Sequence, residues 1–207
     1  MIKANVTVTG RITRSAQIRT DKNNKPYLSF VVTLVLQDVK TKQKSIDIVV
    51  TDANGTQNDL SRYVEKKRVE VKGELRIKKK GDDYVFYLSA TEISMKDVSG
   101  IDSVAGQLEF IGHLGSKGAE EWKDKKGNPF LAFSARSTEK INDDTYVDTW
   151  IDFIKFPPKG EELVVPDWLK AKSKVKVTGD LQIRSYNDKL RFGCRVRDYT
   201  LYIPPQK

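Results

Sequence analysis

The first half of the 207-residue chain recurs in its second half. VTVTGRIT, which contains Gly10, is repeated as LEFIGHLG, which contains Gly112, and NKPYLSFVV is repeated as GNPFLAFSA. Farther along, VEVKGELRIK recurs as VKVTGDLQIR, and YVFYLSATEI recurs as LRFGCRVRDY. The offset between the copies grows from 102 or 103 residues to 106, which indicates an insertion in the loop PPKGEELVVPDW. An internal repeat of this length predicts two domains, at 1–98 and 99–207, with the boundary in the polar stretch KDVSGI.

Each copy has the pattern of β-strands. Apolar residues alternate with polar and charged ones in VEVKGELRIK and in VKVTGDLQIR, which is the two-residue period of a half-buried strand. Gly73 and Gly179 occupy the same place in these two strands, where a glycine marks a bulge or a tight bend. Hairpin turns are expected at 81–83 and 187–188.

The two copies together predict an all-β fold. Each copy contains five expected strands and one short helical stretch, at 58–67 in the first copy and at 166–172 in the second. Five strands, one short helix and a glycine inside a strand favour the OB-type barrel. We therefore expect two tandem five-stranded Greek-key barrels of the OB type, each with one short helix.

Composition argues against catalysis and metal binding. His113 is the single histidine and Cys194 the single cysteine, and Cys194 lies on the apolar parity of its strand, as a buried structural thiol would. We find neither a glycine-rich phosphate loop nor paired metal ligands in the sequence. We therefore expect a protein that is not an enzyme and has no cofactor and no bound metal.

Charge and hydropathy point to an anionic partner in the cytoplasm. The chain lacks both the run of about 18 apolar residues that a membrane helix needs and the start of a signal peptide, so we expect a cytoplasmic protein with no membrane partner. The formal net charge is +9, which favours polyanions such as nucleic acids, because basic side chains release the counterions of phosphates on binding. Charge alone does not decide this, since many basic proteins bind no anion.

With the strands placed, both repeats resemble the bacterial single-stranded-DNA-binding protein family. VTVTGRITRSAQIRT is similar to the opening strand of that family, and DTWIDFIKF is similar to its third strand, where Trp150 and Phe156 match two stacking aromatics. Tyr186 and Trp122 fall where the family often carries further aromatics. The resemblance implies sequence-tolerant binding of single-stranded DNA, in DNA replication, recombination or repair.

The resemblance also bears on assembly. Family members with one barrel per chain commonly form tetramers, so it implies a homodimer with four OB folds. Family members usually end in an acidic recruitment tail, whereas this chain ends in YIPPQK, so no such tail is expected.

The expected nucleic-acid-binding residues are aromatics for base stacking and cations for phosphates. Those in the second copy are Trp122, Trp150, Phe156, Tyr186, Arg184, Arg191, Arg195 and Arg197, and those in the first are Tyr27, Arg76, Lys78, Lys79 and Lys80. Trp150 and Phe156 are six residues apart and therefore point to the same face of a strand. The alternatives are that both rings belong to the core and that the cations are merely solvated.

The two copies differ in charge and in aromatic content. Residues 1–98 hold 19 Lys or Arg against 12 Asp or Glu, which gives +7, whereas 99–207 hold 18 against 16, which gives +2. Aligning Asp47 with Asp152 places Ser45 opposite Trp150, Thr51 opposite Phe156, and Lys80 near the place of Tyr186. We therefore predict that the second barrel grips bases and the first grips the backbone. The alternative function is an OB module that binds protein, as a primosome-like accessory, or RNA.

Overall fold

A computed structural model describes residues 1–36, 43–81, 83–141 and 144–204 of the chain. Most of these residues lie in β-strands, so the all-β prediction is confirmed. Two compact units are formed: an N-terminal unit of residues 4–106 and 183–190, and a C-terminal unit of 1–3, 107–182 and 191–207. The predicted boundary at 98 and 99 stays a prediction. Asp82 of the predicted turn at 81–83, and the last three residues of YIPPQK, lie outside the described residues.

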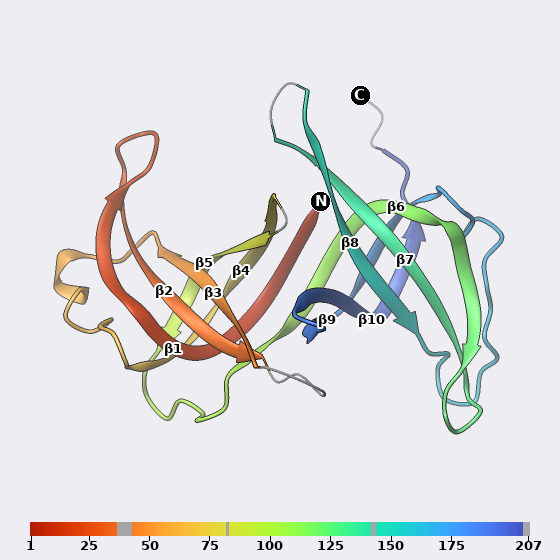
Figure 1. Cartoon of the computed structure of the whole chain (residues 1–207), viewed down its shortest axis with the longest axis horizontal. Coiled ribbons are helices and arrows are strands. Elements are labelled where there is room, and N and C mark those ends of the chain that lie inside the picture. The colour runs from red at the N-terminus through yellow and green to blue at the C-terminus, as the bar shows by residue number, and fades with distance from the viewer. Residues whose placement is uncertain (37–42, 82, 142–143, 205–207) are drawn as a thin grey trace. The chain divides into compact units, whose positions relative to one another are not determined.

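In the first repeat, five strands pair in a closed order. They are β1 (Ile2–Thr20), β2 (Pro26–Leu36), β3 (Lys44–Asp52), β4 (Arg68–Lys80) and β5 (Asp83–Ser94). Their order is β2-β3-β5-β4-β1, and β2 also pairs with β1, so the sheet closes on itself (Figure 1). β3 and β5 are parallel, and the pairs β1–β2, β1–β4, β2–β3 and β4–β5 are antiparallel.

The second repeat has the same pairing order. Its strands are β6 (Ser103–Lys123), β7 (Pro129–Lys140), β8 (Tyr146–Lys155), β9 (Lys174–Tyr186) and β10 (Lys189–Leu201). They are ordered β6-β7-β8-β10-β9, with β6 also paired to β9, and β8 and β10 are again parallel. The predicted loop around PPKGEELVVPDW is irregular, as expected.

Strand alternation builds the core as the sequence predicts. Val69, Val71, Leu75 and Ile77 of β4 are buried, and so are Val175, Val177, Leu181 and Ile183 of β9. Removing such side chains from water is the main favourable contribution to folding.

The two glycines inside these strands permit close approach of the backbones. A Cβ atom on Gly73 would lie 2.1 Å from the carbonyl oxygen of Ser89, and one on Gly179 would lie 2.2 Å from that of Arg195. The pairing of β4 with β5 shifts register between Lys72 and Gly73. The predicted bulge is therefore confirmed at Gly73, and both positions exclude any larger residue.

The predicted helices at 58–67 and 166–172 are wrong. The first region holds only a 3-10 turn, η1 (Gln57–Asp59), followed by irregular turns, and the second holds turns. Helices of this length are marginal in water without a packed face, and each region buries a single large side chain, Tyr63 in the first and Leu169 in the second. Within the described ranges, no helix is long and apolar enough to cross a membrane.

The β9–β10 turn confirms the prediction at 187–188. Asn187 and Asp188 both have positive φ, at 49° and 59°. A two-residue hairpin turn with positive φ at both central residues matches the right-handed twist of its strands.

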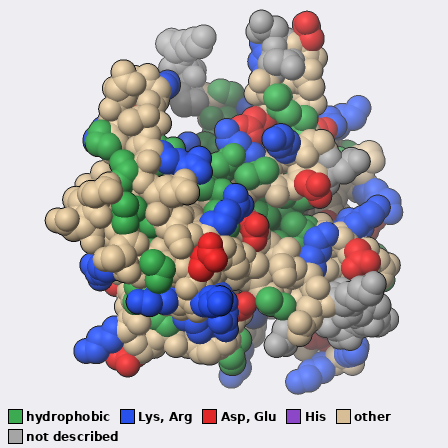
Figure 2. Space-filling view, turned by 60° about the vertical axis from the view of Figure 1, so that its left-hand side comes forward, with side chains coloured by type: hydrophobic (Ala, Val, Ile, Leu, Met, Phe, Trp, Pro, Cys, Tyr) green, Lys and Arg blue, Asp and Glu red, His purple; other side chains and the backbone are tan. Residues whose placement is uncertain are grey.

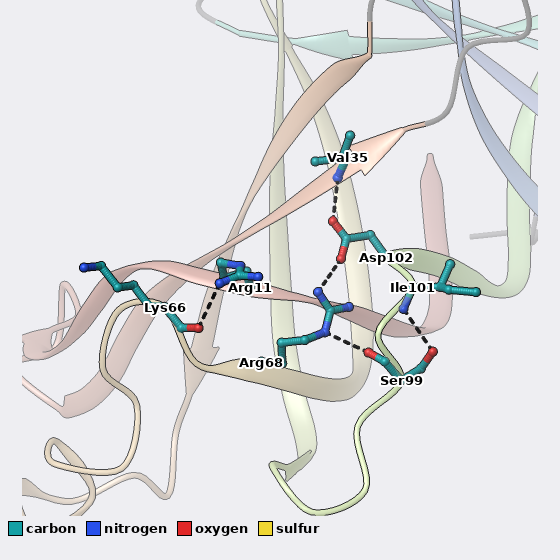
Figure 3. A network of polar contacts seen from close by, with 7 residues as sticks. All are labelled: Arg11, Val35, Lys66, Arg68, Ser99, Ile101 and Asp102. Atoms are coloured by element: carbon teal, nitrogen blue, oxygen red, sulfur yellow. Dashed lines mark hydrogen bonds and ion pairs between the residues drawn. The ribbon is translucent and has the colours of Figure 1, made fainter.

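The segment between β5 and β6 is anchored to the N-terminal unit by a polar network (Figure 3). Arg68 of β4 donates its Nε to the carbonyl oxygen of Ser99 at 2.7 Å and its Nη1 to Asp102 Oδ1 at 2.8 Å. The other oxygen of Asp102 accepts the backbone N–H of Val35 at 2.9 Å. One carboxylate therefore holds both β2 and β4.

Candidate nucleic-acid interface

The C-terminal unit carries a groove of about 510 Å³ over strands β6, β7 and β8. Its volume lies within the range of about 300–1,000 Å³ that is typical of ligand sites. Trp122 and Trp150 both line it. The other lining residues used below are Gly115, Lys117, Ser134, Asp152 and Ile154.

The Trp150 ring is partly exposed, with one face over Gly115 and with Arg136 beside it. Its side chain is 45% exposed, which confirms the expectation that this ring is not in the core. The ring lies over Gly115, where a Cβ atom would come within 3.3 Å of Trp150 Cζ3. Arg136, the cross-strand partner of Trp150, places its guanidinium carbon 6.0 Å from the ring centroid, and it also bonds Asp148 at 2.8 Å. A base stacked on this ring would therefore lie near a cation that is already oriented.

Trp122 is 55% exposed at the end of β6. The hairpin that follows it is fixed by Asp124, whose carboxylate accepts the side-chain and backbone N–H groups of Asn128 at 3.0 and 2.9 Å and the backbone N–H of Lys126 at 2.8 Å. These hydrogen bonds, chiefly those from Asn128, lower the pKa of Asp124 below its usual value. An ionised Asp124 thus stabilises the turn that follows Trp122.

Phe156 offers less free surface than either tryptophan. It is half-buried just beyond β8, with its ring centroid 5.4 Å from that of Phe130. The guanidinium carbon of Arg195 lies 5.4 Å from the Phe156 centroid. This ring is therefore already engaged by a second ring and by a cation.

The predicted cations are exposed except for Lys79, and they differ in their ion pairs. Arg191, Arg195 and Arg197 are exposed while the alternate residues Phe192, Cys194 and Val196 are buried, as the strand pattern predicts. Arg197 bonds Asp180 at 2.7 Å, and in the other unit Arg76 bonds Glu74 at 2.8 Å. Lys78 and Lys80 are exposed, whereas Lys79 is half-buried.

Figure 2 shows one face of the molecule, on which Lys and Arg side chains are interspersed with Asp and Glu and with hydrophobic side chains. On this face, phosphate contacts would come from individual cations.

Arg184 and Tyr186 are exposed at the end of β9, where Tyr186 is 53% exposed. Both belong to residues 183–190 of the N-terminal unit, whereas Trp122 and Trp150 belong to the C-terminal unit. The described groove lining does not include them.

We compared the chain with known proteins. No family model and no curated protein sequence matches it. The wild-type single-stranded DNA binding protein from Thermus aquaticus is 13% identical over 99% of this chain and 95% of its own, with a TM-score of 0.47. The small single-stranded DNA-binding protein from Streptomyces coelicolor is 16% identical over 48% of this chain and 96% of its own, with a TM-score of 0.36.

The dimeric N-terminal domain of the PriB protein from Thermoanaerobacter tencongensis is also similar. It is 17% identical over 47% of this chain and 97% of its own, with a TM-score of 0.32. The chain is thus similar to solved bacterial single-stranded DNA-binding proteins, the class that its sequence resembles. Likenesses with TM-scores this low do not assign a function.

Strand register aligns the two repeats and corrects the alignment made from sequence. Phe30 pairs with Val50 and Phe133 pairs with Phe153, while Val50 pairs with Leu88 and Phe153 with Cys194. The offset across β3 and β8 is therefore 103, not the 105 that aligning Asp47 with Asp152 assumed.

The corrected offset changes which residues correspond. Asp47, not Ser45, holds the place of Trp150, and Ala53, not Thr51, holds the place of Phe156. The pairs Arg19–Tyr27 and Trp122–Phe130 likewise place Arg19 where the second repeat has Trp122.

The N-terminal counterpart of the groove is charged and hydrogen-bonded. Asp47 accepts a hydrogen bond from the hydroxyl of Thr33 at 2.6 Å and lies 3.7 Å from Arg14. A carboxylate at this place repels phosphates instead of stacking on bases. The two repeats thus differ at both tryptophan positions of the groove.

Cys194 is the buried thiol that the sequence predicts, with a side chain 2% exposed. Burial, followed by the negative charge of Asp180, raises the pKa of this thiol to about 12. It takes no part in the groove.

Sequence reasoning missed two residues that shape the groove. Gly115 makes room for the Trp150 ring, and Arg136 orients a cation beside it. The glycine that ends LEFIGHLG was visible in the sequence, but its contact with a residue two strands away was not.

Proposed function

We propose that the protein binds single-stranded DNA through the groove of the C-terminal unit. The observation that carries this proposal is that Trp122 and Trp150, both about half exposed, line the same groove. Large aromatic side chains are usually well buried when they only stabilise a fold. Two half-exposed indoles at one groove are instead the arrangement that stacks on unpaired bases, at about 1–3 kcal/mol per base.

The groove supplies polar groups beside the rings. The Ser134 hydroxyl donates to Asp152 Oδ1 at 2.6 Å, and Lys117 lines the same groove. Lys117 in the groove and Arg136 beside the Trp150 ring are cations available to phosphates, while Asp152 and Ile154 add one acidic and one apolar side chain to the lining. The two indole faces can stack on any base, because stacking does not depend on a pattern of donors and acceptors.

The closed pairing order and the parallel pairs β3–β5 and β8–β10 support the assignment of each repeat as an OB-type Greek-key barrel. Roles in replication, recombination or repair, a homodimer with four such barrels, and a cytoplasmic location belong to the same proposal.

Fluorescence titration of the full chain tests the proposal. All three tryptophans lie after residue 120 and within the C-terminal unit, so their emission reports on this unit alone. We expect oligo-dT to quench the emission and to bind more tightly than duplex DNA of matched length. Equal affinity for the duplex would contradict base stacking, and tighter binding of RNA would favour an RNA-binding function.

A further inference from the structure

The N-terminal unit contains a hollow of about 400 Å³ beside Tyr27. Its lining includes Lys25 and Tyr27 from the β1–β2 hairpin, Thr51 and Ala53 at the end of β3, and Ser89 of β5. Tyr27 and Thr51 are half-buried, whereas Lys25, Ala53 and Ser89 are exposed. The hollow is therefore open to solvent and has one aromatic ring in its wall.

The hairpin that carries Lys25 and Tyr27 is well defined. The Asp21 carboxylate accepts the backbone N–H groups of Asn23 at 2.8 Å and Lys25 at 2.9 Å. Asp124 caps the corresponding turn of the second repeat in the same way. The wall that Tyr27 belongs to is thus pre-formed.

The second repeat fills the corresponding space with its own side chains. By strand register, Phe130 corresponds to Tyr27, Phe156 to Ala53 and Arg195 to Ser89. There the Phe156 ring packs against Phe130 with centroids 5.4 Å apart, and the Arg195 guanidinium lies 5.4 Å from the Phe156 centroid. The second repeat's phenylalanine and arginine are replaced by alanine and serine in the first. Within the described part of the first repeat, no second ring therefore packs against Tyr27.

We propose that this hollow takes up one base of the bound single strand, which packs against Tyr27 where Phe156 packs against Phe130. The space fits a planar ring because a planar ring occupies its counterpart. The net charge of +7 over residues 1–98 favours a polyanion. Lys25 lines the hollow and supplies a cation for a phosphate, beside Asp21, whose Oδ1 accepts the backbone N–H groups of its own turn. The hydroxyls of Ser89 and Thr51 add polar groups at the edge.

This inference rests on the proposed function. It gives the first repeat a contact with a base, which Asp47 and Arg19, at the places of the two groove tryptophans, do not provide by stacking. An aromatic side chain of a partner protein is the competing occupant. Neither the +7 charge nor Lys25 favours it.

Photocrosslinking of the full chain tests the inference. The probe is a thymidine oligonucleotide that carries 5-iododeoxyuridine, and crosslinked peptides are mapped by mass spectrometry. We expect crosslinks at Tyr27 as well as at Trp122 and Trp150. In Ala53→Phe, which restores the ring found in the second repeat, the Tyr27 crosslink should fall about tenfold or more, within the roughly 5- to 150-fold that one stacking contact represents.

Matched variants guard against trivial explanations. Ala53→Ser changes the same exposed position without filling the hollow and should keep the Tyr27 crosslink. Ser89→Arg, which restores the cation of the second repeat, fills the hollow from another strand and should reduce the crosslink even if Ala53→Phe folds poorly.

The outcomes separate this inference from the proposed function. Crosslinks at Trp122 or Trp150 with none at Tyr27 would overturn the inference alone, and so would a Tyr27 crosslink that both filling variants leave unchanged. Crosslinks at none of the three residues, together with unquenched tryptophan emission, would overturn the proposed function as well.

Discussion

Replacing Trp150 with alanine tests whether its ring is a stacking platform. The ring is 45% exposed, so roughly 100 Å² of the 150–250 Å² that an aromatic side chain can bury lies against protein. At about 25 cal/mol per Å², the variant should lose at most about 2.5 kcal/mol of folding stability. That loss is smaller than the total stability of about 5–15 kcal/mol that is common for domains, so the variant should still fold.

Trp150→Ala should weaken the binding of oligo-dT without changing its dependence on salt. Loss of one platform should weaken the Kd for oligo-dT by about 5- to 150-fold, which corresponds to about 1–3 kcal/mol. The slope of log K against log salt should not change, because an indole neutralises no phosphate. Anisotropy of a labelled oligonucleotide, measured over a salt series, gives both quantities without relying on the tryptophan that was removed.

Trp168 provides the matched control. It is half-buried in the same unit, packs against Tyr199 with ring centroids 5.7 Å apart, and is not among the residues that line the groove. Trp168→Ala should cost stability but leave the Kd unchanged. An unchanged Kd in Trp150→Ala, or an equal loss in both variants, would refute the assignment of Trp150 as a platform.

Three further predictions address charge, the buried thiol and the strand glycines. Replacing exposed Lys78 and Lys80 with glutamine should flatten the single-strand salt slope by about 1.4, at about 0.7 per lost phosphate contact; an intact slope would mean that both are only solvated. Burial raises the pKa of Cys194 from 9.0 to about 12, so iodoacetamide at pH 9 should label the thiol in urea but not in the native protein, and native labelling at the urea rate would show that the thiol is accessible. The stability that comes from keeping this thiol neutral should be full below pH 9 and should decline as the pH rises toward 12. Gly179→Ala should lower the thermal midpoint sharply, because its Cβ would lie 2.2 Å from a carbonyl oxygen, whereas Gly100→Ala should not, because nothing lies within 4 Å of its Cβ. Equal midpoints of the two variants would contradict the close approach of the backbones at Gly179.

Much of the fold could be predicted because it depends on local pattern. The alternation in β4 and β9 indicates which side chains are buried, and the repeat indicates that whatever the first copy forms, the second copy forms again. The role of Gly73 and Gly179 could be predicted because a glycine inside a strand usually marks a bulge, a tight bend or a close approach of another backbone. The burial of Cys194 could be predicted because the residue lies on the apolar side of its strand.

The site could be predicted only in part because it depends on register. A shift of two residues in the alignment of β3 with β8 keeps every side chain on its correct face, so the alternation could not reveal the error. The strand pairings, such as Val50 with Leu88 and Phe153 with Cys194, show that Asp47 holds the place of Trp150. The predicted helices were wrong for a different reason: stretches of seven to ten residues are too short to form stable helices without a packed face.

Because all three tryptophans lie in the C-terminal unit, intrinsic fluorescence can report whether the two units unfold cooperatively. During denaturation, tryptophan emission follows that unit, whereas far-UV circular dichroism follows the strands of both units. Coincident transitions would mean that the repeats unfold together as one two-state system, and separate transitions would mean that each melts alone. The asymmetry left by the divergence of two similar repeats therefore lets an unlabelled sample report how far they remain coupled.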